Sequence, residues 1–314
     1  MSEGQPQEFL HSQAERGHNT AVHFTFLRHS QKANANVFNQ DGGISAAAIS
    51  TGGQERAKQL GKKRFAGRDI DKSYGTKVTR TRETLAAAFG AAGVDPVFLE
   101  KSDATEAYFA LPAQAGSKAY NKRYDDIMEP HRQTYITEHF PGKKFAELPP
   151  DEQEIVAEYA EEPAMEWYLA HNSERPDAET PSPREDAARV AYKINHLVNV
   201  VDYMPGGKEV DLVSSGHKTS TEAFLKYVIE RQVGDKTIVG FNTLSDIGGS
   251  LKILDGWDLD VKNNERGEKT ATIILRRENG DTQAFGLNLK KLHELAAEYM
   301  AANKLPTKKI DTGK

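Results

Sequence analysis

The feature that most constrains this chain is a short alternating apolar run, residues 21–27, that ends in a charged dipeptide, Arg28-His29. The run contains β-branched and aromatic residues, which predicts a buried strand. A similar junction lies far downstream, where the strand expected at 210–214 leads into His217. Because open α/β sheets bind ligands beyond the carboxyl ends of their strands, both histidines are expected at one edge of a sheet.

Strand-like and helix-like segments alternate along most of the chain, which favours parallel strands. We therefore expect an α/β fold, a three-layer sandwich with a mostly parallel central sheet and helices on both faces. Asn279-Gly280 is a strong hairpin signal and predicts C-terminal antiparallel edge strands. The expected strands are 21–27, 72–78, 97–99, 210–214, 251–253 and 272–275, and the expected helices are 54–65, 85–89, 151–169, 184–203, 219–231 and 289–302.

The middle of the chain, about residues 110–181, differs in composition from its flanks. It is charged, rich in tyrosine and helix formers, and contains several prolines, among them Pro163. We expect a helical cap insertion there, with the helix 151–169 broken or kinked near Pro163. The remaining expectations are a disordered lead at 1–20, one domain over 21–305 and a flexible tail at 306–314.

Bulk composition narrows the class of protein. The formal charge is −5, so the chain lacks the basic footprint of a nucleic-acid-binding protein. It has no cysteine, which excludes disulfides and thiolate metal sites. No run approaches the ~20 apolar residues of a membrane span, and no secretory signal is visible. The expectation is a soluble, cytoplasmic protein with no nucleic-acid or membrane partner and with an oligomeric state left open.

A third cationic residue follows the strand expected at 72–78. Arg80 lies just before a run of strong helix formers, and the start of a helix favours anions. His217 follows Gly216, which is expected to allow a tight strand-to-helix turn. Two arginines and two histidines gathered at strand ends would bind and attack a phosphoryl group.

Several strings resemble the histidine phosphatase (phosphoglycerate mutase-like) superfamily. That family carries Arg-His-Gly after its first strand, Arg-x-x-[Gln/Glu]-Thr at the start of a helix, and a late strand that ends in a histidine. The run 49–57 is also similar to the family's threonine-glycine helix start. The resemblance covers about residues 21–108 and 184–255. The three matching strings are Leu27-Arg28-His29-Ser30, Arg80-Thr81-Arg82-Glu83-Thr84 and Val213-Ser214-Ser215-Gly216-His217.

The resemblance implies a phosphomonoester hydrolase that works through a phosphohistidine. His29 would be the nucleophile, while Arg28, Arg80 and His217 would hold the phosphoryl oxygens. No metal and no cofactor are expected. The substrate would be a phosphorylated small molecule or a phosphoprotein.

The general acid, which protonates the leaving oxygen, is less well determined. In the family a carboxylate usually follows the third strand. Glu106 is the expected acid because its distance along the chain from Arg80 is near the family pattern. Glu100 and Asp103 remain alternatives.

Three departures from the family pattern bear on the activity. Ser30 replaces the glycine, and the asparagine often found seven residues after the arginine is absent, since position 35 is Ala35. Lys32 stands where many members have threonine or serine. These features weaken the mutase reading, although a phosphoglycerate mutase-like phosphotransferase stays an alternative. Lys32 and Lys218 would either contact phosphate or be solvated.

Two other interpretations fit parts of the sequence. A non-catalytic module that binds a phosphorylated ligand could use the same fold. Gly216-His217-Lys218-Thr219 is superficially like a nucleotide-binding P-loop, but the earlier glycine is missing because position 211 is Asp211. Substrate choice is assigned to side chains of the insertion, namely Tyr108, Tyr120, Arg123, Tyr124, His131 and Arg132.

Overall fold

The computed structural model describes residues 16–33, 48–76, 78–95, 111 and 116–305. Its strands are β1 (Thr20–Arg28), β2 (Lys72–Gly75), β3 (Glu209–Gly216), β4 (Ile229–Val233), β5 (Lys236–Val239), β6 (Gly256–Asn263), β7 (Lys269–Arg276) and β8 (Thr282–Leu287). Its helices are α2 (Thr51–Arg64), α3 (Thr79–Ala92), α5 (Lys118–His139), α6 (Pro150–Ala170), α7 (Pro183–Val200), α8 (Lys218–Val228) and α9 (Leu289–Ala302), with short 3-10 turns η1 (Phe145–Glu147) and η2 (Leu244–Ile247).

The described strands form one mixed sheet in the order β2-β3-β1-β6-β7-β8-β4-β5. Only β2, β3 and β1 run parallel to one another, and every other neighbouring pair is antiparallel. The expectation of a mostly parallel sheet is therefore wrong. The physical reason is the short connections between β6, β7 and β8, because parallel neighbours need a long crossover.

The hairpin expected at Asn279-Gly280 is confirmed, since it joins β7 to β8. These strands do not lie at the edge, however, because β4 and β5 extend the sheet beyond β8. The strand expected at 251–253 is wrong as well. Leu251 and Ile253 are fully buried loop residues, and a short apolar run of this kind has the same composition as a buried strand. The true strand is β6, in which Trp257, Leu259 and Val261 alternate with polar residues, the pattern of a strand with only one face in the core.

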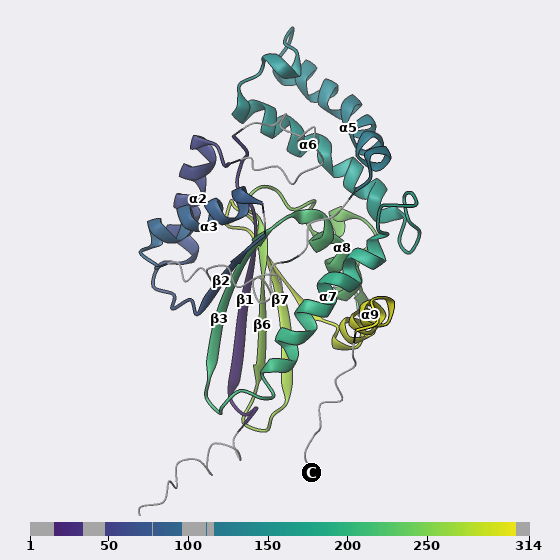
Figure 1. Ribbon diagram of the computed structural model, residues 1–314. Coiled ribbons are helices and arrows are strands. Elements are labelled where there is room, and N and C mark those ends of the chain that lie inside the picture. The colour runs from purple at the N-terminus through teal and green to yellow at the C-terminus, as the bar shows by residue number, and fades with distance from the viewer. Residues whose placement is uncertain (1–15, 34–47, 77, 96–110, 112–115, 306–314) are drawn as a thin grey trace, which may run out of the picture.

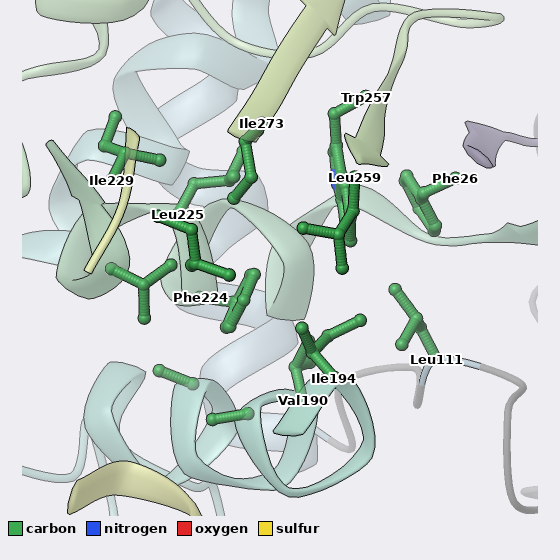
Figure 2. Packing of buried hydrophobic residues seen from close by; sticks show 14 of the residues in the cluster. Phe26, Leu111, Val190, Ile194, Phe224, Leu225, Ile229, Trp257, Leu259 and Ile273 are labelled. Carbon is green, nitrogen blue, oxygen red and sulfur yellow. The ribbon is translucent and has the colours of Figure 1, made fainter. Parts of the chain in front are cut away.

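Side chains of β1 alternate between the two faces of the sheet, as a strand requires. Val22, Phe24 and Phe26 belong to the larger core, which also contains α7 and α8 residues, whereas Leu27 belongs to a second core with α2 and α3. Figure 2 shows the larger core, where Phe26 and Trp257 from the strands lie near Ile194 of α7. Figure 1 accordingly shows α2 and α3 on one side of the sheet and α7, α8 and α9 on the other.

Local signals explain where some helices begin and end. α7 starts with a capping box, because the Ser182 hydroxyl accepts from the Glu185 N–H and the Glu185 carboxylate accepts from the Ser182 N–H. α8 is shorter than the expected 219–231, since the chain turns into β4 at Ile229. α6 runs through Pro163 as one helix, so a break there is wrong, while a kink at Pro163 stays a prediction.

The insertion forms a cap built from α5 and α6. Figure 1 shows both helices beyond the end of the sheet at which β1 and β3 finish. Their own small core consists of Ile136, Leu148 and Val156, each almost fully buried. Residues 1–15 and 306–314 lie outside the described residues. Residues 16–19 are described, and the Gly17 N–H donates to the Met204 carbonyl, so the lead expected at 1–20 does not extend to its predicted end.

Within the described residues, no helix combines the length and the apolar character needed to cross a membrane.

Candidate active site

The sheet brings the two histidines together. β1 and β3 are parallel neighbours with Arg28 opposite Gly216, so His29 and His217 follow the ends of adjacent strands. The His29 N–H donates to the Gly216 carbonyl at 3.1 Å. The two imidazole rings are 5.1 Å apart, centre to centre, with 66° between their planes. This corner is buried, and only 4% of His29 is exposed.

A hydrogen bond fixes the tautomer of His29. Its Nδ1 lies 2.8 Å from the Ser30 carbonyl oxygen, which only accepts, so Nδ1 carries the proton. The Nε2 lone pair is then free to attack. Burial, together with the charges of His217, Arg80 and Arg28, holds the pKa of His29 well below its usual value. The ring is therefore neutral at neutral pH, as a nucleophile must be.

Arg80 and His217 form the opposite wall of this corner. Arg80 lies in the first turn of α3, and its Nη2 is 3.4 Å from the Nδ1 of His217. Because a guanidinium only donates, Nδ1 accepts and the proton of His217 is on Nε2. Burial, then the charges of Arg80, Lys32 and Arg28, lower the pKa of His217 to about 3. Burial and the charge of Arg28 also lower the pKa of Arg80 to about 10.

Two donors in this corner have no hydrogen-bond partner among the described residues. They are the Nε2 of His217 and the Nε of Arg80, and both atoms are buried. A buried donor without a partner costs free energy, so such atoms call for an explanation in the site's chemistry. An anionic ligand with several acceptor oxygens would satisfy both.

Hydrogen bonds of Ser30 fix the loop after β1 to α2 and α3. Ser30 is fully buried, its hydroxyl donates to the Gly53 carbonyl at 2.7 Å, and its N–H donates to the Thr84 hydroxyl at 2.8 Å. The serine that replaces the family glycine is thus a structural link between the loop and α2. A Cβ on Gly53 would lie 2.8 Å from the Gln31 carbonyl oxygen, so glycine is required where α2 approaches the loop.

Gly216 allows close packing and does not form a turn. Its backbone is not left-handed, and a Cβ there would lie 3.0 Å from the Phe26 ring. The expectation of a tight glycine turn before His217 is therefore wrong. Close approach of β3 to a core aromatic ring is the physical reason for glycine at this position.

Arg28 is almost buried and points toward the cap. Its Nη1 donates to the Leu251 carbonyl at 2.7 Å, and its Nη2 donates to Glu161 at 3.2 Å. Glu158 lies 3.7 Å from Nη1. Burial by itself lowers the pKa of Arg28, but the surrounding glutamates outweigh it and raise the pKa. The guanidinium is therefore cationic and already holds carboxylates of the chain.

Lys218 is neither solvated nor free. Only 3% of it is exposed, and its Nζ contacts Glu161 at 2.8 Å and the Ser250 hydroxyl at 2.9 Å. The Ser250 hydroxyl donates in turn to Glu222, which is fully buried. Burial raises the pKa of Glu222. This network joins the residue after His217 to the loop that holds Arg28.

The acidic face of α6 was missed by the sequence analysis. Four glutamates on this helix have the i, i+4 spacing of a single face, and Glu161 lies beside them, which is the signal that could have revealed it. Burial raises the pKa of Glu154, which lies closest to the start of the helix. The other members contact cations or the backbone of the loop 244–253. The face consists of Glu154, Glu158, Glu161, Glu162 and Glu166.

A cavity of about 600 Å³ adjoins the site between α5 and α6. Arg28 and Lys32 line its inner end, and Tyr120, Tyr124 and Arg132 line it on the cap side. These three are among the side chains expected to select the substrate. Arg123 and His131 are not in its lining, and Tyr108 lies outside the described residues.

The expected general acid, Glu106, lies outside the described residues, as do its alternatives Glu100 and Asp103 and the strand expected at 97–99. In the part of the chain that is described, no group of three or more histidine, aspartate or glutamate side chains is arranged to hold a metal ion.

The fold and this corner define an α/β protein with a buried cationic pocket around two neutral histidines. No protein-family model matches the sequence, and no curated protein matches it. Solved structures do resemble it, and those described next are histidine phosphatase or phosphoglycerate mutase-like proteins, the family that the sequence motifs resemble.

A mycobacterial glucosyl-3-phosphoglycerate phosphatase is 13% identical over 85% of this chain and 99% of that chain, with a TM-score of 0.42. A phosphoglycerate mutase from Bacillus anthracis is 12% identical over 89% and 98%, with a TM-score of 0.41. A Hafnia alvei phytase is 10% identical over 91% and 96%, with a TM-score of 0.46. Similarity at this level carries no argument about activity, which therefore rests on the site itself.

Proposed function

We propose that this protein hydrolyses a phosphomonoester through a phosphohistidine on His29. One observation carries the proposal: two buried donors that have no partner among the described residues, on Arg80 and His217, lie in the same corner as an imidazole whose Nε2 carries no proton. A phosphoryl group supplies acceptors for the donors and an electrophile for the imidazole. Phosphoryl transfer depends mainly on such positioning and charge.

The first step forms a bond between His29 Nε2 and phosphorus and breaks the bond to the leaving oxygen. Arg80, His217 and Arg28 stabilise the equatorial oxygens, where negative charge is spread. Glu106 is proposed to donate a proton to the leaving oxygen. In the second step water attacks phosphorus as the bond to His29 Nε2 breaks, and the Glu106 carboxylate takes a proton from that water. Orthophosphate is released, and neutral His29 and the protonated acid are regenerated.

Two finer parts of the proposal follow the family resemblance: independence from metal ions, and a phosphorylated small molecule or phosphoprotein as substrate. The three-layer arrangement is proposed from the alternation of strands and helices, and the cytoplasmic location from the composition. Hydrolysis that is unchanged by EDTA tests the independence from metal ions.

A non-catalytic module that binds a phosphorylated ligand is the second candidate. The observation in its favour is that Glu161 and Glu158 already contact Arg28. In such a module the cation would hold the cap in place and would not assist a reaction.

Hydrolysis of p-nitrophenyl phosphate separates the two candidates, with the His29→Ala variant as control. We expect turnover by the wild-type protein, none by the variant, and an acid-labile, alkali-stable phosphoryl label on His29. A broad panel of monoesters with no turnover would refute the enzyme. Transfer of the label to a second hydroxyl in place of water would favour a mutase.

A further inference from the structure

Glu161 binds the two cations that adjoin the histidine pair. Its Oε2 lies 2.8 Å from Lys218 Nζ and 3.2 Å from Arg28 Nη2. Both cationic side chains are nearly buried, whereas 22% of the Glu161 side chain is exposed. A carboxylate of the cap therefore holds the positions at which these cations would meet an anionic ligand.

Four other glutamates near this corner have a different kind of partner. Each of the four accepts a hydrogen bond from a backbone N–H of the loop 244–253, so it fixes that loop. In the hydrogen bonds and ion pairs of the described residues, every partner of Glu161 is a cationic side chain. The backbone-bound pairs are Glu158 with Ile253, Glu162 with Ser250, Glu166 with Leu244 and Glu222 with Leu251.

This difference decides which carboxylate a ligand could displace. Moving Glu158 or Glu222 would leave a backbone N–H without its acceptor, which costs free energy. Moving Glu161 breaks only ion pairs, and an incoming anion would re-form them at once. Because 22% of the Glu161 side chain is exposed, water can solvate the displaced carboxylate.

We propose that Glu161 is a specificity-determining residue of the phosphate site: its carboxylate competes with phosphoryl oxygens for Arg28 and Lys218, and a dianionic phosphoryl group displaces it. The inference rests on the proposed function only in placing a phosphoryl group at this corner. A dianion gains more from two cations than a monoanion does, so the competition favours monoesters over diesters. Glu161 thus makes the affinity of this corner depend on the charge of the ligand.

The charge of Glu161 supports this role at neutral pH. Burial alone would favour the protonated acid, but Lys218 and Arg28 hold the pKa of Glu161 at about 2. The competitor is therefore ionised at neutral pH. Neutralising it removes the competition without removing either cation.

The test compares orthophosphate binding to the wild-type protein and to Glu161→Gln by isothermal titration calorimetry at pH 7.5. We expect the variant to bind phosphate about tenfold more tightly, because no carboxylate has to leave. Glu152→Gln is the matched control, since it is the same substitution on the same helix and Glu152 has no ion pair with Arg28 or Lys218. Its phosphate affinity should stay within about twofold of wild type.

Methyl phosphate and dimethyl phosphate extend the comparison to specificity. The preference for the monoester should shrink severalfold in Glu161→Gln. Glu161→Asp keeps the charge but shortens the side chain, so it should bind phosphate with intermediate affinity, and it serves if the glutamine variant does not fold.

The inference is overturned if Glu161→Gln binds phosphate with unchanged or lower affinity, as a residue that merely positions Arg28 would require. Failure of both proteins to bind phosphate overturns it too. Hydrolysis is measured separately: tighter phosphate binding without turnover refutes the proposed enzyme alone, and turnover with unchanged binding refutes the inference alone.

Discussion

Two cationic clusters flank the same strand, and they differ in what holds their charges. The strand-end cluster consists of Arg28, His29, Arg80 and His217. The sheet-face cluster lies nearer the start of β1, around a cavity of about 530 Å³, and consists of His23, Arg64, Arg68 and Arg276 with Asp211, Asp258 and Asp260.

The sheet-face cluster supplies its own anions. Asp211 binds Arg68 at 2.6 Å, and Asp258 binds Arg64 at 2.8 Å. His23 lies 2.5 Å from Asp260, and this hydrogen bond raises the pKa of His23. In the strand-end cluster, burial and neighbouring cations lower the pKa of His29. The pKa values of two histidines six positions apart in the sequence are therefore shifted in opposite directions.

A cluster of arginines and histidines is therefore not by itself evidence of a ligand site. A cluster whose cations are bound by aspartates stabilises the fold, even though Arg64 Nη1 there is a buried donor without a partner among the described residues. A buried cluster in which the described residues offer Arg80 and the two histidines no carboxylate partner is suited to bind an anion.

The largest expected effect comes from the two histidines. His29→Ala should lower kcat for monoester hydrolysis by about a thousandfold or more, because the nucleophile is lost. His23→Ala, on the same strand, should retain kcat within about threefold. Both are measured with p-nitrophenyl phosphate after circular dichroism shows the fold intact. Equal losses in the two variants would remove the functional distinction between the clusters.

Arginine variants give the next largest effect. Arg80→Ala should lower kcat/KM by about a hundredfold, which matches the loss of one donor to transition-state charge. Arg80→Lys should recover little, because an ammonium lacks the planar fork of the guanidinium. Arg68→Ala is the sheet-face counterpart and should leave kcat/KM nearly unchanged. A comparable loss in Arg68→Ala would contradict the assignment.

Stability should show the reverse order. Arg68→Ala leaves Asp211 without its bidentate partner and should lower the free energy of unfolding by about 1 to 2 kcal/mol. Arg80→Ala removes the 3.4 Å hydrogen bond to His217 and an Nε donor that has no partner among the described residues, so it should cost about 0.5 kcal/mol, less than Arg68→Ala. Urea unfolding measures both. A larger loss for Arg80→Ala would mean that this residue mainly stabilises the fold.

The smallest effect is on the pH dependence. His23, with its raised pKa, should stabilise the protein below the unfolded histidine value of about 6.5, and this contribution is lost as the pH rises through its folded pKa. His29 and His217, with lowered pKa values, act in the opposite sense, so their contribution is lost as the pH falls below about 6.5.

Histidine proton chemical shifts measure this contrast directly. At pH 6 the ring of His23 should be protonated, while those of His29 and His217 should remain neutral. Asp260→Asn should lower the pKa of His23 and change stability by less than about 1 kcal/mol, since the pair is partly exposed. Titration of His29 near pH 6.5 would contradict the burial argument.

Much of the fold was predictable from local signals. The alternation in residues 21–27 gave β1, and the last helix, 289–302, was predicted to its bounds. Asn279-Gly280 marked the hairpin because its chemistry is local. The sheet was misjudged because β6 joins it antiparallel to β1, a strand more than 200 residues earlier in the chain. A local segment of sequence does not reveal such a distant pairing partner or its direction.

The site divides in the same way. By itself the sequence determined which residues end β1 and β3, because strand ends follow from local apolar patterns and from the motif around His29 and His217. Only the tertiary structure decided that Arg80 approaches His217, that Lys218 is buried, and that Glu161 of a distant helix contacts Arg28. Charge pairing depends on distance in space and on burial, and neither is a property of a local segment of chain.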